Sequence, residues 1–316
     1  METRRRNKLS IIGAGAVGSS LAFASLIKGA ARQVSLYDVN GNKARAEALD
    51  LEHGTQFMPT ARVEGSDDPD VTLNSDIVVI TAGAKQKPGE TRMDLAASTV
   101  GLMKKVIPPI VERSPQALFL MVTNPVDVTT YASLKISGLP SNQLFGSGTV
   151  LDSSRLRVLV AQHCGVAIQN VHAYICGEHG DTAIPIWSSA TIAGVPLLKW
   201  EIQTGKLGES VRDEMAESVV NAAYEVIAGK GATNYAIGVS GARIIEAMFR
   251  DEHRVLPVSS MLNGWHGISD VCMSVPTIVD RRGVGMNVEI PLLDGELGAM
   301  HDSAEAISAT LRRIGF

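Results

Sequence analysis

A glycine-rich turn directly after the first apolar run constrains the fold of this chain more than any other feature. The run Leu9–Ile12 ends at Gly13, and GAGAVG precedes a helix-like stretch. Glycines in this pattern allow a tight turn and a close approach of phosphate to the backbone, while the amides of the following helix hold the anion. The pattern alone is weak, because glycine-rich turns between strands and helices are common. Its place after a strand and before a helix predicts a dinucleotide-phosphate site at Gly13, Gly15 and Gly18.

Short apolar runs alternate with helix-period stretches through the first half of the chain. The strand-like runs are Leu9–Ile12, Val34–Tyr37, Ile77–Thr81 and Leu118–Val122. Because these runs are apolar throughout, they predict strands that are buried on both faces, as in a parallel sheet covered by helices. We therefore expect a doubly wound α/β domain over residues 1–148.

The pattern changes after Gly148, where we expect a second domain over residues 149–316. A helical segment from Leu151 to about His163 is followed by an apolar run, Val171–Cys176, and a polar loop. Further along we predict helices at Val211–Ile227 and Ile237–Met248, strands at Val255–Met261, Ile268–Val275 and Val284–Ile290, and a C-terminal helix with one apolar stripe. This mixture predicts an α+β domain, packed tightly on the first because no flexible linker separates them.

Composition excludes several classes of protein. The chain has 316 residues, of which 45% are hydrophobic and 20% charged, which is typical of a globular protein, and its length suggests two domains at roughly 150 residues each. A formal net charge of -4 is too small to favour a nucleic-acid or membrane partner. Any anionic ligand must therefore be held by local groups.

The cysteines and the apolar runs bear on the cellular compartment in which the protein works. Three cysteines without a C-x-x-C pair argue against a disulfide framework and a zinc ribbon, and favour a reducing environment. The first apolar run is too short for a signal peptide, and no stretch approaches the ~20 residues of a membrane-spanning helix. We expect a cytoplasmic protein.

An acidic residue ends the second predicted strand. Asp38 lies 20 residues after Gly18. A carboxylate at this position accepts hydrogen bonds from an adenosine ribose and repels a 2′-phosphate, which favours NAD over NADP. The alternative is an aspartate that forms the turn before Asn40 and Gly41.

A single histidine stands in the polar loop GEHGD, which follows the apolar run Val171–Cys176. Because histidine titrates near neutral pH, His179 is a candidate acid or base at the end of a strand. One alternative is a loop histidine that binds its neighbours. Another is a metal site with Glu178 and Asp181, but no second histidine lies at metal-ligand spacing, so we predict none.

Three further segments carry candidate polar groups. Asp152 and Arg155 lie three residues apart and share one face of a predicted helix, where an ordinary ion pair is the alternative. Asn124 follows a strand and can offer its amide to a carbonyl group. The polar loop of residues 82–92 is a candidate lid that could bring Arg92 to a reacting carbonyl, or else a surface loop with solvated charges.

Together these motifs resemble the L-lactate/malate dehydrogenase family. GAGAVG, DLEHG, TAGAKQKPGETR, TNPVDV, GSGTVLDSSRLR, GEHGD and GKGATNYAIG occur in the order and spacing of that family from about residue 8 to the C-terminus. The set is far more specific than any single motif. The resemblance implies a Rossmann-type first domain and a hydride transfer between NAD(H) and C2 of a small 2-hydroxy or 2-keto acid.

The resemblance also implies a role for each candidate residue. His179 would exchange the proton and Asp152 would orient it, while Arg155 would bind the substrate carboxylate and Arg92 would stabilise charge on the carbonyl oxygen. Asn124 and Thr233 would complete the pocket. The implied cofactor contacts, besides the glycines and Asp38, are Val17, Lys43, Gly83, Ala84, Thr123, Asn124 and Ser147.

One loop position separates the substrates of the family. Enzymes acting on lactate commonly carry glutamine there and those acting on malate arginine, and this chain has Gln86. An uncharged amide leaves the second carboxylate of oxaloacetate unpaired, which favours pyruvate and L-lactate. Lys85 and Lys87 flank this position and keep malate as an alternative. The remaining hypotheses are a dehydrogenase of the same family that acts on another 2-hydroxy acid, and a non-catalytic NAD-binding protein.

Regulation and assembly are implied by the resemblance alone. Some bacterial members are activated by fructose 1,6-bisphosphate, which an arginine and a histidine bind between subunits, and Arg157 and His172 stand at those positions. The alternatives are a solvated helix arginine and a packed strand histidine. The resemblance also implies a homotetramer that serves glycolysis and fermentation.

Overall fold

The computed structural model describes residues 7–84 and 92–316, with the side chain of Arg92 left out of the description. The strands of its first half are β1 (Lys8–Ile12), β2 (Gln33–Tyr37), β3 (Arg62–Ser66), β4 (Ile77–Ile80), β5 (Leu118–Met121) and β6 (Leu144–Gly146). The helices are α1 (Ala16–Ile27), α2 (Gly41–Gly54), α3 (Arg92–Arg113) and α4 (Val126–Ser137). Two short 3-10 helices lie at Thr55–Phe57 and Pro69–Thr72.

The second half mixes longer strands with helices. Its strands are β7 (Val171–Gly177), β8 (Ala183–Ile192), β9 (Val195–Pro196), β10 (Arg254–Trp265), β11 (Ile268–Asp280) and β12 (Gly283–Asn287). Its helices are α5 (Val150–Cys164), α6 (Leu197–Thr204), α7 (Glu209–Lys230), α8 (Tyr235–Phe249) and α9 (Asp294–Arg313), with a 3-10 turn at Ile168–Asn170.

Among the described residues, the strands of both halves join in one sheet. Its order is β3-β2-β1-β4-β5-β6-β10-β11-β7-β8-β9, with β12 paired to β11. The first six strands are parallel, and the order 3-2-1-4-5-6 is that of the Rossmann fold. From β10 onwards the pairs are antiparallel. The predicted α/β domain followed by an α+β domain is confirmed.

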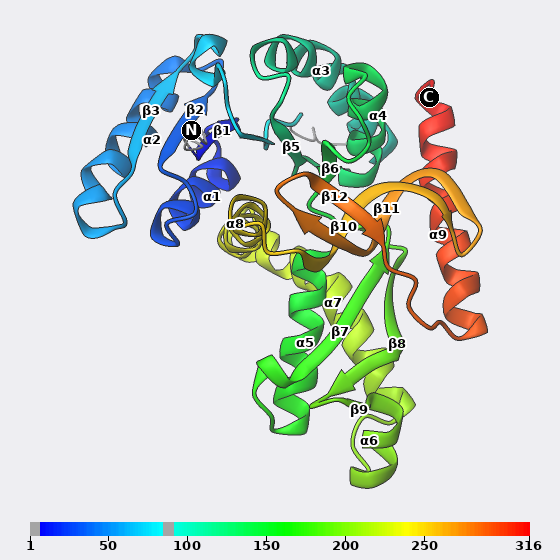
Figure 1. Ribbon diagram of the computed structural model, residues 1–316. Helices are drawn as coiled ribbons and strands as arrows, with labels where there is room; N and C mark the ends of the chain where they lie inside the picture. The colour runs from blue at the N-terminus through cyan, green and yellow to red at the C-terminus, as the bar shows by residue number, and fades with distance from the viewer. Residues whose placement is uncertain (1–6, 85–91) are drawn as a thin grey trace.

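Alternation along the parallel strands divides the core into two faces. In β1, Leu9 and Ile11 pack with α1, α2 and α8, whereas Ile12 packs with α3, α4 and α9. Helices therefore cover both faces, as the continuous apolar runs predict. A third apolar cluster lies between α5, α7, β7 and β8 in the lower part of Figure 1.

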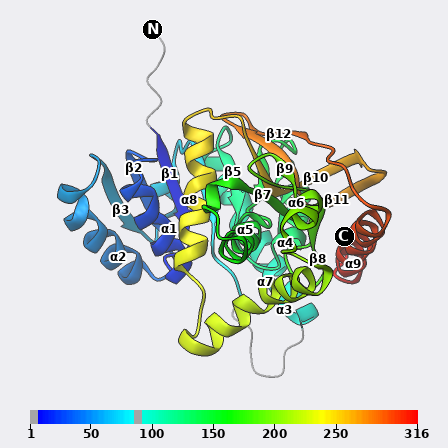
Figure 2. The ribbon, with the colours of Figure 1, turned by 90° about the horizontal axis from the view of Figure 1, so that it is seen from below.

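Helix α8 comes from the second half but covers the first. It runs beside α1 in Figures 1 and 2. A Cβ at Gly238 would lie 2.9 Å from backbone atoms of Ser20, and one at Gly241 would lie 2.6 Å from Leu21. Asn234, which precedes the helix, donates to Ser20 Oγ. Glycines thus let the two helices approach closely.

Several elements lie outside the sequence predictions. β3 has one buried apolar residue, Val63, because it is an edge strand, and β6 has only three residues, so neither forms an apolar run. β8, β9 and α6 are half-exposed and lack a clear pattern. The predicted strand Val284–Ile290 ends earlier, at Asn287.

The predicted helices and the other predicted strands are found. The stripe of the C-terminal helix buries Met300, Ala304, Ile307 and Leu311. Within the described residues, no helix combines the length and the apolar character needed to cross a membrane.

Candidate active site

The glycine-rich turn joins β1 to α1 at the carboxyl edge of the parallel sheet. Gly13 has φ +107°, and a Cβ on it would lie 2.9 Å from the backbone of Ala82. A Cβ on Gly18 would lie 2.0 Å from the carbonyl oxygen of Gly13, so this position admits only glycine. At Gly15, by contrast, a Cβ would enter open space, and no described side chain caps the helix. The turn therefore leaves the amides of α1 accessible and fits a pyrophosphate.

Asp38 connects the second strand to this turn. Its Oδ2 accepts the backbone N–H of Ala14 at 2.8 Å, and its Oδ1 accepts the N–H of Asn40 at 2.9 Å. The turn-forming role and the ribose-binding role are therefore compatible. The carboxylate is held against the glycine-rich turn, where a ribose beside the bound pyrophosphate would be in reach.

The other predicted cofactor residues lie mostly around the same sheet edge. Thr123 Oγ1 donates to the carbonyls of Ile80 and Ala82, and so joins the ends of β4 and β5. Ser147 follows β6 and donates its N–H to Met121. Beyond these, Gly83 and Ala84 follow β4, Val17 lies in the first turn of α1, and Lys43 is exposed in the first turn of α2.

His179, Asp152 and Arg155 meet in the wall of a cavity of about 320 Å³. His179 Nδ1 lies 2.6 Å from Asp152 Oδ2, and Arg155 Nη1 donates to Asp152 Oδ1 at 2.6 Å. Only 7% of the Asp152 side chain is exposed, against 28% for His179 and 19% for Arg155. The ordinary ion pair considered for Asp152 and Arg155 exists, and the same carboxylate also binds the histidine. Asn124 lines the cavity as well.

The electrostatics of this group favour an ionised pair. Burial by itself would raise the pKa of Asp152, but His179 and Arg155 outweigh it and hold that pKa below its usual value. Burial would likewise lower the pKa of His179, but the Asp152 carboxylate raises it above the ordinary value. An ionised carboxylate only accepts hydrogen bonds, so Nδ1 carries a proton and Nε2 is left for a ligand.

Two side chains from other helices anchor the loop that carries His179. Asp127, in the first turn of α4, accepts the backbone N–H of His179 at 2.7 Å. Ser303 of α9 accepts the N–H of Glu178 at 2.8 Å. Gly177, with φ +89°, turns the chain into the loop. The sequence predictions include neither Asp127 nor Ser303, because an acid in a first helical turn and a serine in a helix are ordinary features.

Some predicted substrate residues are not placed in the cavity. Gln86 lies outside the described residues, as does the side chain of Arg92, whose backbone begins α3. Thr233 lies in the connection between α7 and α8 and is not among the described residues that line the cavity.

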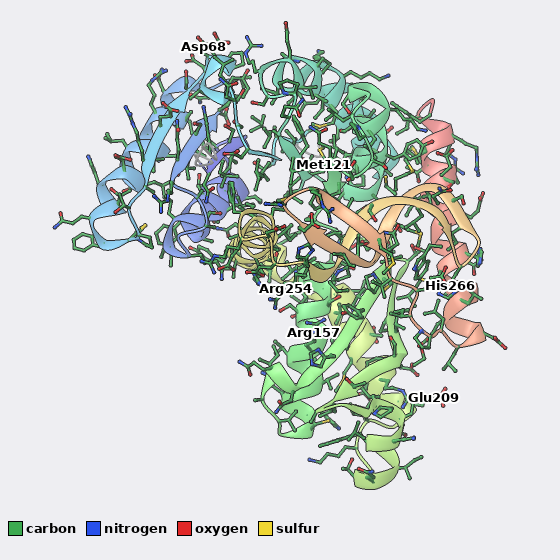
Figure 3. All side chains as sticks on the ribbon, in the orientation of Figure 1. Asp68, Met121, Arg157, Glu209, Arg254 and His266 are labelled. Atoms are coloured by element: carbon green, nitrogen blue, oxygen red, sulfur yellow. The ribbon has the colours of Figure 1, made fainter. Side chains whose placement is uncertain are left out.

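Arg157 and His172, the predicted effector residues, lie on neighbouring elements. Arg157 of α5 donates from Nε to the carbonyl of Ala173, the residue after the exposed His172 in β7, and its guanidinium stacks over Tyr174. Burial lowers the pKa of Arg157, and the charge of Arg254, which is labelled near it in Figure 3, lowers it further. Several cationic or ionisable groups are therefore close together here.

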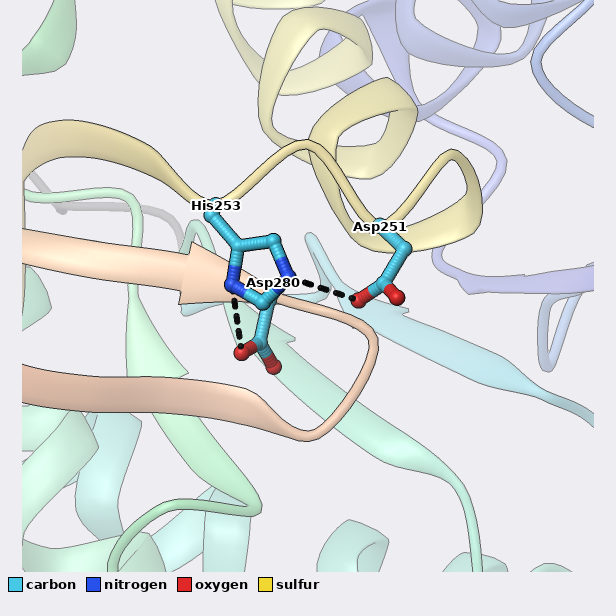
Figure 4. Close-up of side chains that lie close together, drawn as sticks. All are labelled: Asp251, His253 and Asp280. Carbon is cyan, nitrogen blue, oxygen red and sulfur yellow. Dashed lines mark ion pairs between the residues drawn. The ribbon is translucent and has the colours of Figure 1, made fainter.

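A separate cluster, Asp251, His253 and Asp280, has atoms that could ligate a metal (Figure 4). His253 Nδ1 lies 3.2 Å from Asp280, and Nε2 lies 3.8 Å from Asp251. Arg281 also pairs with Asp251, and Arg282 with Asp280. Because arginines already neutralise both carboxylates, this cluster is an ion-pair network, and none of its members lines the cavity.

Comparisons with known proteins identify the family. The model for the lactate/malate dehydrogenase NAD binding domain matches residues 7–146, and that for the lactate/malate dehydrogenase alpha/beta C-terminal domain matches residues 149–314. The chain belongs to the lactate/malate dehydrogenase family. It is an NAD-dependent oxidoreductase, and the residues of its glycine-rich turn fit that cofactor.

Named relatives of this dehydrogenase span almost its whole length. An L-lactate dehydrogenase of Bifidobacterium animalis subsp. lactis is 53% identical over 311 residues, covering 98% of this chain and 97% of the relative. One from Thermoanaerobacter pseudethanolicus is 44% identical, covering 98% and 99%. The crystal structure of minor L-lactate dehydrogenase from Enterococcus mundtii in the ligands-bound form has a TM-score of 0.95 at 36% identity, covering 98% and 99%.

Proposed function

We propose that this dehydrogenase interconverts pyruvate and L-lactate, with His179 as the acid and base. The observation that carries the proposal is the Asp152 carboxylate, which binds His179 through one oxygen and Arg155 through the other at the wall of one cavity. The L-lactate dehydrogenases among its relatives support the substrate.

Each side chain has a distinct part in the reaction. When NAD is bound, its nicotinamide would supply the hydride acceptor for the 2-hydroxy acid, and in the reverse direction the hydride donor for the 2-keto acid. His179, held by Asp152 at Nδ1, donates a proton from Nε2 to the carbonyl oxygen or removes it from the hydroxyl. Asp152 stabilises the imidazolium, because its charge lies 2.6 Å from the ring. Arg155 has further N–H donors for the substrate carboxylate besides the one that binds Asp152.

The remaining roles rest on the sequence pattern. Arg92 would stabilise negative charge on the carbonyl oxygen, and Asn124 and Thr233 would contact the substrate. We also propose residues 1–148 as the NAD-binding domain and 149–316 as the substrate domain. The residues that would hold NAD are those of the glycine-rich turn and Asp38, together with Val17, Lys43, Gly83, Ala84, Thr123, Asn124 and Ser147.

Gln86 is the basis for choosing pyruvate over oxaloacetate. We expect purified protein to oxidise NADH with pyruvate at a much higher kcat/KM than with oxaloacetate, because an amide cannot pair with a second carboxylate. Gln86→Arg should shift the ratio towards oxaloacetate. Comparable or reversed values for the unaltered protein would contradict the assignment of lactate as the preferred substrate.

The part of His179 is tested by His179→Gln. We expect kcat to fall by about 10²- to 10⁴-fold, the range of a positioned acid or base. NADH binding, followed by fluorescence titration, should persist because neither the glycine-rich turn nor Asp38 is among the described residues that line the cavity with His179. Near-normal turnover would remove His179 from the mechanism.

We further propose activation by fructose 1,6-bisphosphate in a cytoplasmic homotetramer, with the effector phosphate bound by Arg157 and His172. The charge of Arg254 near Arg157 supports an anion site. The three cysteines are buried and form no disulfide bond with one another, which accords with a reducing compartment. A pyruvate saturation curve that the bisphosphate leaves unchanged at several pH values would reject the activation, and sedimentation analysis tests the assembly.

A further inference from the structure

A buried aspartate lies beneath the loop that carries His179. Asp127 is 2% exposed and stands in the first turn of α4. Its Oδ2 accepts the backbone N–H of His179 at 2.7 Å, a contact between residues 52 positions apart. Asp152 holds the ring of the same histidine. Two carboxylates from different helices therefore bind one residue, one through its main chain and the other through its side chain.

Helix capping does not explain the burial of Asp127. The helix dipole already stabilises an acid in a first turn at an exposed position, where water also solvates the charge, so this interaction does not require burial. The second oxygen, Oδ1, is also buried and has no hydrogen bond of regular geometry within the described residues. Burying a carboxylate with one oxygen unpaired costs free energy, whereas a neutral acceptor could bind the same N–H at less cost. What aspartate adds at this position is negative charge.

Strand β10 places one hydroxyl group, that of Ser259, beside this carboxylate, and the neighbouring β11 carries a second buried hydroxyl. Ser259 of β10 and Ser274 of β11 are opposite each other in the sheet, and Ser274 is also opposite Gly177, where the loop begins. Both hydroxyls are buried and, like Asp127 Oδ1, have no hydrogen bond of regular geometry among the described residues. Ser259 is close enough to Asp127 to lower its pKa. The carboxylate thus has a polar neighbour, Ser259, that favours its ionised form.

The charges that face Asp127 come from the loop and from β11. Burial raises the pKa of Asp127 to about 6, Ser259 and the two contributions of His179 oppose that rise, and Glu178 adds to it. Cys272 of β11 also faces it, and burial keeps this thiol protonated by raising its pKa. The carboxylate is therefore half ionised near pH 6 and largely ionised only well above it, where its charge raises the pKa of His179.

We propose that Asp127 is a positioning residue for the proposed reaction, one that fixes the main chain of His179 and places a second negative charge behind its imidazole. It acts through His179 and does not touch the substrate. The inference rests on the proposed function. Asp152 and Arg155 of α5 are the other charged groups that act on this ring.

The first test separates charge from hydrogen bonding. Asp127→Asn keeps an acceptor oxygen and removes the charge, whereas Asp127→Ala removes both. For pyruvate reduction we expect kcat to fall by about 10-fold in the first and about 100-fold in the second, with KM for NADH unchanged, because a small misplacement of a catalytic group has effects of this size. The pH above which reduction declines should move to lower pH in both variants, since less negative charge faces His179.

A matched control distinguishes this role from simple loosening of the loop. Ser303→Ala removes an uncharged anchor of the same loop, the acceptor of the Glu178 N–H. Its kcat is expected to fall, but its pH profile should stay in place. If Asp127→Asn keeps the profile of the unaltered protein, as Ser303→Ala should, the proposal is overturned.

A second measurement needs no turnover. The rate at which diethyl pyrocarbonate modifies His179, followed by mass spectrometry across pH, reports the pKa of that ring in the free protein. In Asp127→Asn we expect the pH at which the modification rate changes to be lower than in the unaltered protein. Ser259→Ala should shift it in the same direction by less, and this smaller substitution provides the test if the Asp127 variants do not fold. An unmoved transition overturns the proposal, even if the protein turns out to act on another substrate. Failure with pyruvate alone affects only the proposed function.

Discussion

At the scale of single residues, the candidate site depends on one buried carboxylate with two cationic neighbours. Asp152 is stable as an anion because each oxygen accepts from a different side chain, His179 or Arg155. In return it raises the pKa of His179, so that the protonated ring persists to higher pH than in a free histidine. The residue that orients the acid therefore also sets the pH range in which the acid works.

This gives a prediction for Asp152→Asn. Pyruvate reduction needs protonated His179, so in the unaltered protein it should persist above pH 6.5, the ordinary value, and decline as pH rises through the raised pKa. In the asparagine variant this decline should begin at a lower pH than in the unaltered protein. Its kcat should also be reduced by about 10²-fold or more. Initial rates across pH measure both effects.

Asp67→Asn is a suitable control, because Asp67 pairs with Arg45 on the surface of the first half. It should retain the profile of the unaltered protein. An unshifted profile in Asp152→Asn would show that this carboxylate does not control the protonation of His179.

At the scale of secondary-structure elements, the close contact of α1 and α8 links the cofactor turn to the second half. α1 begins at the glycine-rich turn, and α8 covers its outer side through Gly238 and Gly241. Both glycines lie in a helix, where alanine would usually be the more favourable residue. Their small size is explained by the backbone of α1, which leaves no room for a Cβ at Gly238.

We therefore expect Gly238→Ala to destabilise the fold. Overpacking of a tight contact costs about 1–3 kcal/mol, which outweighs the gain of roughly 0.5–1 kcal/mol in helix propensity. Gly101→Ala is the control, since Gly101 lies in α3 and a Cβ there would meet nothing within 4 Å. Urea unfolding should show the first variant less stable and the second unchanged or more stable. Equal stability of the two variants would contradict the helix contact.

At the scale of the whole molecule, the two halves share a sheet and two apolar cores. β6 pairs with β10 through Gly146 and Ser259, and this pair continues the parallel sheet into the antiparallel one. Helices α8 and α9 of the second half complete the cores on the two faces of the first. The first half alone would leave these apolar surfaces exposed, so it is not complete without the second half.

Unfolding in urea should consequently be a single transition. The three tryptophans, Trp187, Trp200 and Trp265, all lie in the second half, so their fluorescence reports that half, while far-ultraviolet circular dichroism reports both. Shared cores predict coincident curves from the two probes. Phe57→Trp, at an exposed position of the first half, supplies a fluorescent reporter there. Two separate midpoints would show that the halves unfold independently.

Local patterns predicted most of the fold for a physical reason. Strands buried on both faces, such as β1 and β4, must be apolar throughout, and amphipathic helices such as α9 repeat every three to four residues. The edge strand β3 and the short strand β6 carry no such pattern, because their place in the sheet is set by neighbouring strands.

The sequence by itself determined the glycine-rich turn, the acid that follows the second strand, the histidine between glycines and the resemblance that joins them. Each is recognised from residue types at short spacing, because local backbone geometry links such patterns to turns, strands and helices. Only the tertiary structure decided that Asp127 holds the main chain of His179 and that α8 lies on α1, and it gave the geometry of the Asp152–His179 contact that the resemblance implied. These contacts join residues far apart in the chain, so they depend on how strands and helices pack.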